Sequence, residues 1–161
     1  MTRNSLAEKN CSLARALDVV GEWWSLLVVR EAFFGTRRFQ DFVDNLGIAR
    51  NILSSRLKRL VAEGVLSRAE RADGGVDYAL TPKGEALMPV LVALMQWGDT
   101  FANAEPAPVV LTDRATGTPI APLSVRAADG RVLTPQDMRA VPGPGADAQL
   151  RARLMPRSSK R

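Results

Sequence analysis

The apolar residues of the first hundred positions recur at intervals of three and four, which is the period of an α-helix. Four such stretches each stop just before a glycine, a residue that commonly ends helices. The helices predicted from them cover residues 11–20, 22–34, 37–46 and 49–63. The second is apolar most of the way round, so we expect it to be the buried central helix.

Beyond the fourth helix the period changes from helical to alternating. Two short strands are predicted over residues 65–71 and 76–80. Asp73, Gly74 and Gly75 lie between them and tolerate the positive φ that a tight turn requires. We therefore expect the two strands to form a β-hairpin.

A long amphipathic helix is predicted after the hairpin. Thr81 suits the N-cap position, and Pro82 suits the first helical position. Apolar or small residues then follow in a near-heptad seam, which is typical of a helix that packs against another helix. The seam residues are Leu87, Leu91, Leu94, Gly98 and Phe101. Pro89 lies within this helix and is expected to kink it or to restart it.

The composition changes near residue 105, because eight of the ten prolines lie from Pro106 onward and the last aromatic residue is Phe101. We therefore predict a packed helical domain over 1–104, a small β-rich appendage over 105–145 and a flexible basic tail over 146–161. The expected fold class is mainly α with a small β-hairpin (α+β), carrying a short, proline-rich, β-type C-terminal appendage.

The residue inventory argues against an enzyme and against a bound metal or cofactor. The chain has no histidine and one cysteine, Cys11, so histidine-based triads, cysteine zinc sites and an intramolecular disulfide are excluded. It also has no glycine-rich phosphate loop. No apolar run is long enough to span a membrane, and the N-terminus lacks an apolar signal stretch, so we expect a cytoplasmic protein.

Positive charge is concentrated on the predicted helix 49–63. The chain carries a net charge of +5, and residues 49–60 contain four basic residues and no acidic one. On charge alone, a solvated helix face explains this excess better than a nucleic-acid site does. The order of elements changes that interpretation, since helices, a basic helix, a hairpin and a long helix form the sequence of a winged helix-turn-helix domain.

The apolar positions of helix 49–63 predict which side chains face DNA. At about 100° per residue, Leu57 and Leu60 lie close to Leu53 on the helix circumference, and the polar residues face the other way. That face would enter the major groove, and hairpin 65–80 would act as the wing. The predicted DNA-binding residues are Arg37, Arg38, Arg50, Asn51, Ser54, Ser55, Lys58, Arg59, Arg68 and Arg71.

Side-chain chemistry suggests which part of the DNA each of these residues contacts. Arg50 suits guanine and Asn51 suits adenine, whereas Lys58 and Arg59 lie further along the helix and suit phosphates. Arg56 borders the inner face, so a structural ion pair explains it equally well.

Six stretches of the first hundred residues occur in an order and at a spacing that identify a family. They are Cys11–Trp24, Leu26–Glu31, Gly35–Phe39, Ile48–Leu60, Glu63–Leu66 and Tyr78–Gly84. Together they resemble the HxlR-type regulators over about residues 10–102. The resemblance implies a dimeric winged-helix transcription factor, usually bacterial, whose first and last helices form the dimer. The dimer-interface residues expected on these helices are Leu13, Leu17, Leu87, Leu91, Leu94 and Phe101.

The resemblance also bears on Cys11 and on the tail. Several members use a cysteine at this position to sense oxidants or electrophiles, so Cys11 is a candidate redox sensor; its alternative role is packing as a small apolar residue. Some members continue into a zinc-ribbon-like module. Here its ligand positions hold Thr116, Thr118, Arg126 and Asp129, so we expect the turns of that module without its metal.

The function expected from these observations is a homodimeric repressor that binds double-stranded DNA at an inverted-repeat operator, associated with the nucleoid when bound. An alternative is a switch of the same type that responds to a small apolar or electrophilic effector. Trp23, Trp24, Met95 and Trp97 are the candidate pocket residues, although ordinary core packing explains them better. A protein–protein adaptor is a third possibility, against which the basic residues of helix 49–63 argue.

Overall fold

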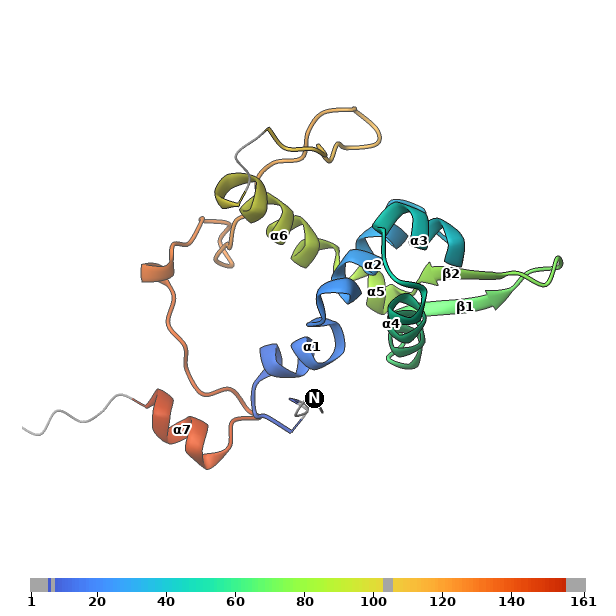
Figure 1. Cartoon of the computed structure of the whole chain (residues 1–161). Helices are drawn as coiled ribbons and strands as arrows, with labels where there is room; N and C mark the ends of the chain where they lie inside the picture. Colours follow the sequence, from blue (N-terminus) through green and yellow to red (C-terminus); the bar gives the residue numbers. More distant parts are fainter. Residues whose placement is uncertain (1–5, 7, 103–105, 156–161) are drawn as a thin grey trace, which may run out of the picture. The chain divides into compact units, whose positions relative to one another are not determined.

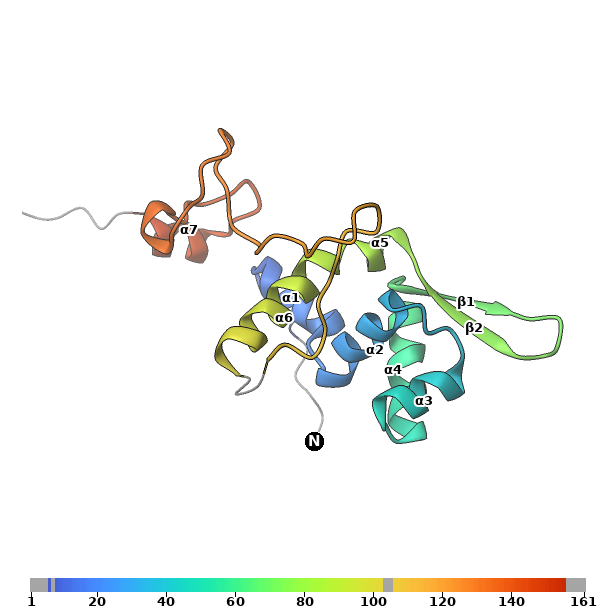
Figure 2. The same ribbon diagram turned by 90° about the horizontal axis from the view of Figure 1, so that it is seen from above.

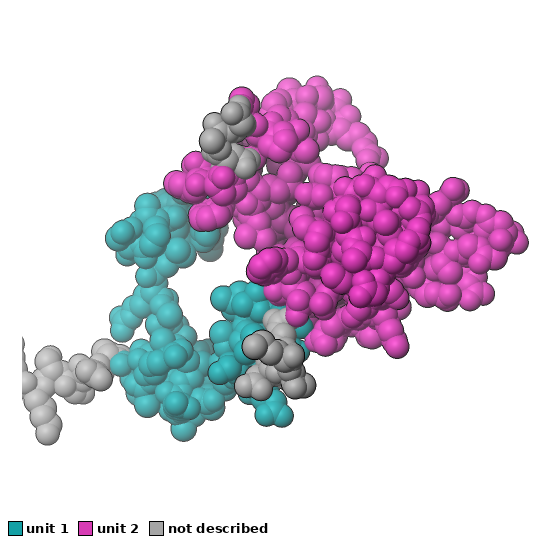
Figure 3. All heavy atoms as spheres, in the orientation of Figure 1, with its two compact units in different colours: residues 1–18, 124–161 teal, residues 19–123 magenta. Residues whose placement is uncertain are grey.

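The computed structural model describes Leu6, residues 8–102 and residues 106–155, and the chain forms two compact units. One unit consists of residues 19–123, and the other combines residues 1–18 with residues 124–161 (Figure 3). Neither boundary coincides with the predicted divisions near 105 and 146. Among the described residues, no helix is long and apolar enough to cross a membrane.

Four helices lie where the apolar period predicts them, which confirms this part of the sequence interpretation. They are α1 (Ser12–Val20), α2 (Trp23–Phe33), α3 (Phe39–Leu46) and α4 (Arg50–Ala62). As expected, α2 is the central helix of unit 19–123 and packs against α3, α4, the hairpin and the last helix of the unit. Its Val28 and Val29 are fully buried, and the removal of their apolar surface from water stabilises the fold.

The turn between α3 and α4 is tight and anchored in the core. Gly47 ends α3 in the left-handed conformation (φ 60°), which glycine adopts without strain. Its N–H donates to the carbonyl of Val43 at 2.9 Å, in the manner of a helix C-cap. Ile48 follows and is only 2% exposed, so the turn is held by a buried side chain.

The predicted hairpin is confirmed. Strands β1 (Leu66–Glu70) and β2 (Val76–Leu80) pair antiparallel, with Leu66 opposite Leu80. Gly74 takes a φ of 77° in the turn, as the Asp-Gly-Gly sequence predicts. The hairpin extends away from the helices of its unit in both views (Figures 1 and 2).

A short helix, α5 (Pro82–Glu85), and a longer one, α6 (Met88–Phe101), follow the hairpin. Thr81 caps the first, because its hydroxyl accepts a hydrogen bond from the N–H of Gly84 at 3.2 Å. The helix breaks after Ala86 and restarts with Pro89 in the first turn of α6, which confirms the effect expected of that proline.

Helix α6 has two apolar faces, whereas the sequence suggested one seam. Leu91 and Val92 are buried in the core of this unit, and Leu87 packs against that core. A second row, four and three residues apart, points to solvent. This exposed row consists of Val90, Leu94, Trp97 and Phe101, which are 48%, 49%, 60% and 72% exposed.

The proline-rich segment 106–123 returns along α6 and is tied to it by one side chain. The carboxamide oxygen of Gln96 accepts the N–H of Leu123 at 2.8 Å, and its nitrogen donates to the carbonyl of Ala121 at 3.5 Å. Thr112 and Pro119 form an isolated β-bridge.

The second unit contains α7 (Ala148–Leu154), a short 3-10 helix (Pro135–Asp137) and one isolated bridge, Arg126 with Val132. The β-rich structure expected for 105–145 is therefore limited to two isolated bridges among the described residues, with no strand. Seven prolines in this region lack the N–H that a β-ladder needs. The predicted flexible tail is helical over α7, and residues 156–161 lie outside the described residues.

The positions that correspond to zinc ligands form local turns. The hydroxyls of Thr116 and Thr118 lie 2.7 Å apart in one unit, whereas Arg126 and Asp129 belong to the other. Arg126 donates to the carbonyl of Gly130 at 2.8 Å. In the described part of the chain, no cluster of three or more His, Cys, Asp or Glu side chains could hold a metal ion.

Candidate nucleic-acid interface

Helix α4 separates its apolar and polar residues as the helical-wheel argument predicts. Leu53, Leu57 and Leu60 are at most 1% exposed and pack in the core of unit 19–123. The opposite face is open to solvent. It presents Asn51, Ser55, Lys58 and Arg59, and the exposed Arg50 and Ser54 lie at its flank near the start of the helix. This polar face is the candidate nucleic-acid interface.

Arg50 connects the two helices of the helix-turn-helix pair. Its guanidinium donates a hydrogen bond to the side-chain oxygen of Gln40 on α3. The guanidinium carbon also lies 5.9 Å from the ring centroid of Phe39, within the range of a cation–π contact. Gln40 in turn donates to Asp44 at 2.6 Å, so a chain of polar contacts orients Arg50 at the start of α4.

The remaining basic residues of α4 differ in whether they form ion pairs with other side chains. Arg59 forms an ion pair with Glu63 one turn later, at 3.5 Å, whereas Lys58 is exposed and forms no ion pair within the described residues. Arg56 pairs with Glu22 at 3.4 Å and is half-buried, which confirms the structural interpretation of that residue.

Arg37 and Arg38 lie where the chain passes from α2 to α3, alongside the hairpin. The carbonyl of Arg37 accepts the N–H of Tyr78 at 2.8 Å, and Arg38 forms an isolated antiparallel bridge with Asp77. Their backbones therefore attach this segment to β2, while both side chains are exposed. Two cations are thus held beside β2 of the wing, next to Asp77 and Tyr78.

The basic residues of the wing are paired with its own acidic residues. Arg68 pairs with Glu70 at 3.2 Å, and Arg71 pairs with Asp73 and, at 3.5 Å, with Asp77. The N–H of Gly75 and the guanidinium of Arg71 lower the pKa of Asp73, and the hydrogen bond to Asp73 raises the pKa of Arg71. Arg71 therefore has a structural task in the turn, which its residue type alone does not reveal.

A buried carboxylate ties α2 to α3, and sequence reasoning missed it. Glu31 on α2 is 6% exposed and accepts hydrogen bonds from Arg30 at 2.8 Å, Thr36 at 3.2 Å and Asn45 at 3.2 Å. Thr36 precedes α3, and Asn45 lies in its last turn. The available signal was an acidic residue, directly after Arg30, in a helix that is mostly apolar.

The residues expected in a dimer interface divide into two groups. Leu91 is buried within the chain's own core, and Leu87 packs against that core. The others have large apolar side chains open to solvent in the single chain. They are Leu13, Leu17, Leu94 and Phe101.

The candidate pocket residues are also only partly brought together. Trp23 and Met95 line one cavity between α2 and α6. Trp24 instead packs against the core, and Trp97 contacts Phe101 with ring centroids 5.8 Å apart.

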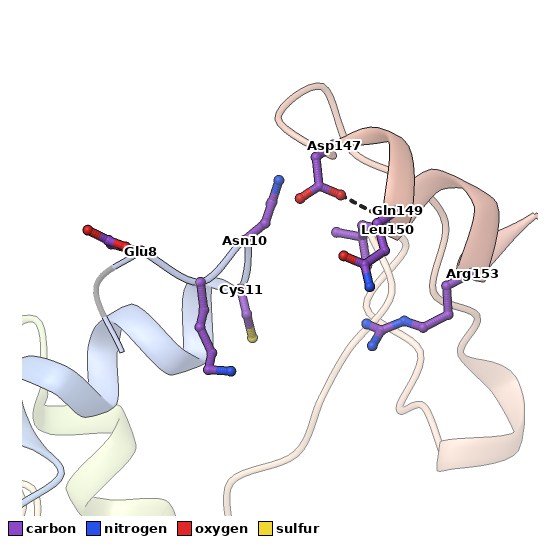
Figure 4. A pocket seen from close by; sticks show the side chains of 8 residues that line it. Glu8, Asn10, Cys11, Asp147, Gln149, Leu150 and Arg153 are labelled. Atoms are coloured by element: carbon purple, nitrogen blue, oxygen red, sulfur yellow. Dashed lines mark hydrogen bonds between the residues drawn. The ribbon is translucent and has the colours of Figure 1, made fainter. Parts of the chain in front are cut away.

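Cys11 is exposed and lies immediately before α1. It lines a cavity of about 450 Å3 within its unit, together with Lys9. Figure 4 shows Gln149, Leu150 and Arg153, from α7, across from the thiol. The side chain of Asn10 donates to the carbonyl of Gly145 at 3.1 Å and so ties the two segments of this unit together.

Comparison with known proteins identifies the family. The model of the HxlR-like helix-turn-helix family matches residues 19–106. The HTH-type transcriptional regulator Rv3095 of Mycobacterium tuberculosis is 41% identical over 142 residues, covering 86% of this chain and 90% of the relative.

Solved structures agree with this assignment. PA1607, described as a transcription factor, aligns with a TM-score of 0.80 and 43% identity over 85% of this chain and 98% of its own. The reduced form of the redox regulator HypR aligns with a TM-score of 0.53 and 26% identity over 58% of this chain and 95% of its own. The chain therefore belongs to the HxlR-like helix-turn-helix family and is a transcriptional regulator with a winged helix-turn-helix fold.

Proposed function

We propose that this regulator represses transcription as a homodimer bound to an inverted-repeat operator. The observation that carries the proposal is the polar, basic face of α4, which lies opposite a fully buried face and beside the exposed hairpin. In this geometry α4 enters the major groove and the hairpin contacts the adjacent backbone or minor groove. A twofold dimer then reads two half-sites about 34 Å apart, one helical turn of DNA.

The start of α4 is the part that reads bases. Arg50 is oriented by Gln40 and Phe39, so less side-chain freedom is lost when it meets a guanine. Asn51 and Ser54 lie on the same exposed face. Lys58, one to two turns further on, meets the phosphate backbone, as do Arg37 and Arg38.

Selection of binding sites from a random duplex library tests the proposal. We expect enrichment of an inverted repeat that the protein binds far more tightly than scrambled DNA. On a template whose promoter overlaps that repeat, transcription should fall when the protein is added. Absence of an enriched site would contradict operator binding, and a rise in transcription would contradict repression.

Arg50→Ala and Lys58→Ala should weaken DNA binding in different ways. Arg50→Ala should cost about 1–3 kcal/mol on the selected site and relax the preference at one base pair. Lys58→Ala should weaken binding to all DNA sequences alike. It should also reduce the slope of log affinity against log salt concentration by about one unit. The measurement is affinity for selected and scrambled duplexes across a salt series.

The matched control for these variants is Arg114→Ala, which removes an exposed arginine from the segment that runs along α6. It should bind as the wild type does. Unchanged affinity in both Arg50→Ala and Lys58→Ala would contradict the placement of α4 in the groove.

The proposed dimer is supported by the exposed row of α6. Its four side chains lie on one helix face and are about half exposed or more, and soluble monomers rarely leave a large apolar patch open to water. We expect Trp97→Lys to shift the protein toward monomer because it places a charge within that face. Trp97 is 60% exposed, so the variant should still fold.

Sedimentation velocity at several concentrations measures this effect. Ala62→Lys is the control, since it adds the same charge at an exposed position of α4. A dimer whose dissociation constant is the same in wild type and Trp97→Lys would place the interface elsewhere.

A second candidate function is a thiol switch at Cys11. Two observations favour it: the thiol is exposed and lines a cavity, and HypR is a redox regulator. Hydrogen peroxide should change operator affinity in the wild type, and dithiothreitol should restore it. The Cys11→Ser variant should bind DNA normally and ignore peroxide. A peroxide response that persists in Cys11→Ser would contradict the proposed role of Cys11 as a thiol switch.

A further inference from the structure

Three side chains on the outer surface of the helix-turn-helix pair form a linear chain of polar contacts. The guanidinium of Arg50, at the start of α4, donates from Nη2 to the side-chain oxygen of Gln40 on α3. The Nε2 of Gln40 donates to Oδ1 of Asp44, one turn further along α3, at 2.6 Å. All three residues are exposed, so these contacts orient surface groups rather than hold the core together.

The chemistry at the two ends of this chain fixes the orientation of the Gln40 carboxamide. A guanidinium has only donors, and a carboxylate has only acceptors. The carboxamide therefore directs its oxygen to Arg50 and its NH2 group to Asp44. Turning it over would face donor with donor and acceptor with acceptor. Asp44 thus acts on Arg50 through Gln40.

The contact with Gln40 leaves Arg50 one edge that Gln40 does not touch. A guanidinium can bind a base bidentately through Nη1 and Nη2 or through Nε and Nη2, so Nη2 contributes one N–H to each edge. Because Gln40 accepts one N–H of Nη2, one of the two edges is incomplete. The guanidinium carbon also lies over the ring of Phe39, 5.9 Å from its centroid. The position of Arg50 and the edge that it offers are therefore both defined before DNA is bound.

We propose that Gln40 is a positioning residue that sets the base preference of Arg50, and that Asp44 in turn orients Gln40. This inference rests on the proposed function, in which the start of α4 reads bases. A guanine presents O6 and N7 to one edge of a guanidinium, whereas an arginine that rotates freely offers either edge to more than one base pair. Gln40 confines Arg50 to one edge and so restricts it to one base pair.

The same contacts argue against direct reading of a base by Gln40. A glutamine reads adenine with its oxygen and its NH2 group together. Here the oxygen accepts from Arg50 and the NH2 group donates to Asp44, so a direct contact of this kind would break both hydrogen bonds. The geometry therefore favours a role of Gln40 through Arg50.

Affinities of the full chain for the selected operator, and for duplexes with each base pair changed in turn, test the inference. Arg50→Ala identifies the base pair that Arg50 reads, as the position where discrimination is lost. Gln40→Ala should reduce discrimination at that same base pair about fivefold or more and leave the other preferences unchanged. Its urea midpoint should match that of the wild type, because Gln40 is exposed.

Three other results for Gln40→Ala would overturn the inference. A uniform loss on every duplex, scrambled DNA included, would show that Gln40 contacts a phosphate. A loss at a different base pair would show that Gln40 reads DNA directly. Stronger discrimination at the base pair of Arg50 would show that Gln40 withholds the guanidinium from DNA.

A variant that combines Gln40→Ala with Arg50→Ala shows whether Gln40 acts through the guanidinium. Its profile over the changed duplexes should equal that of Arg50→Ala alone, since no guanidinium then remains to be oriented. A further loss of discrimination in the combined variant would contradict a positioning role.

Two aspartates of α3 provide a matched pair for the role of Asp44. Asp44→Ala and Asp41→Ala each remove one negative charge from an exposed position of this helix, so both should bind all DNA slightly more tightly. Only Asp44→Ala should also reduce discrimination at the base pair of Arg50. Equal profiles for the two variants would overturn the role of Asp44.

A charge-conserving exchange provides the rescue. Gln40→Glu combined with Asp44→Asn keeps an acceptor toward Arg50 and a donor toward that acceptor, with the net charge of the wild type. This variant should recover the wild-type preference at the base pair of Arg50. Discrimination no better than that of Gln40→Ala would overturn the inference.

Failure of this inference and failure of the proposed function give different results. An operator on which Arg50→Ala loses discrimination but Gln40→Ala does not would overturn the positioning role alone. Absence of an enriched operator, or an operator on which Arg50→Ala changes no preference, would overturn base reading by α4 and this inference with it.

Discussion

Gly84→Ala is expected to destabilise unit 19–123 by at least about 3 kcal/mol and to leave little folded protein at moderate urea concentrations. A Cβ atom at this buried position would lie 2.3 Å from the carbonyl oxygen of Val65 and 2.9 Å from a methyl group of Leu80. Atoms at that separation overlap, so the backbone itself must move.

The carbonyl of Val65 has little freedom to move. It accepts the N–H of Thr81 and the hydroxyl of Thr81, both at 3.1 Å, and Val65 is 1% exposed. Displacing it breaks the contact that joins the end of α4 to the start of α5. The wing follows α4 directly, so DNA binding should fall together with stability.

Gly98→Ala is the matched control, because Gly98 lies inside α6 and an added Cβ meets no atom within 4 Å. Alanine is the better helix former, so this variant should be neutral or more stable by about 0.5–1 kcal/mol. Urea denaturation followed by circular dichroism compares the two. A Gly84→Ala midpoint equal to that of the wild type would show that the close approach to Val65 is unimportant.

Glu31→Ala should cost about 3 kcal/mol of stability, the second large effect. The change removes the acceptor of three hydrogen bonds at a site that is 6% exposed. It leaves the guanidinium of Arg30, the hydroxyl of Thr36 and the amide of Asn45 without that partner. Thr36 and Asn45 still contact each other at 3.1 Å, so the loss should be less than complete unfolding.

Glu31→Gln separates charge from shape. It keeps one acceptor oxygen but turns an NH2 group toward groups that are themselves donors, so we expect a loss of about 1–2 kcal/mol. Asp41→Ala removes an exposed acid from the first turn of α3 and should cost only a few tenths of a kcal/mol. Chemical denaturation of the four proteins ranks them. A Glu31→Ala loss no larger than that of Asp41→Ala would refute the structural role of this carboxylate.

The features that sequence alone determined are those that depend on local periodicity. The four helices and the hairpin follow from apolar spacing and glycine positions, because each element must bury one face and end where the backbone changes direction. The exposure of Asn51, Lys58 and their neighbours follows from the same helical wheel. Pro89 restarts a helix wherever it occurs, since it lacks the N–H of the regular ladder.

Other features depend on which surfaces the chain itself covers, and only the tertiary structure decided them. Helix α6 is apolar on two faces, so its pattern did not show that Leu91 enters the chain's own core while Leu94 and Trp97 stay exposed.

The polar contacts that matter most also lie beyond local pattern. Glu31 meets Asn45 across fourteen positions, Gln40 meets Arg50 across ten, and Gly84 approaches the backbone of Val65. The identity of an arginine or a glutamate in a sequence gives its charge but does not indicate which residue it pairs with. Local spacing therefore determined the elements and the outward face of α4, whereas packing decided which charges are buried, paired or left open, because hydrogen bonds and desolvation depend on neighbours brought together by the fold.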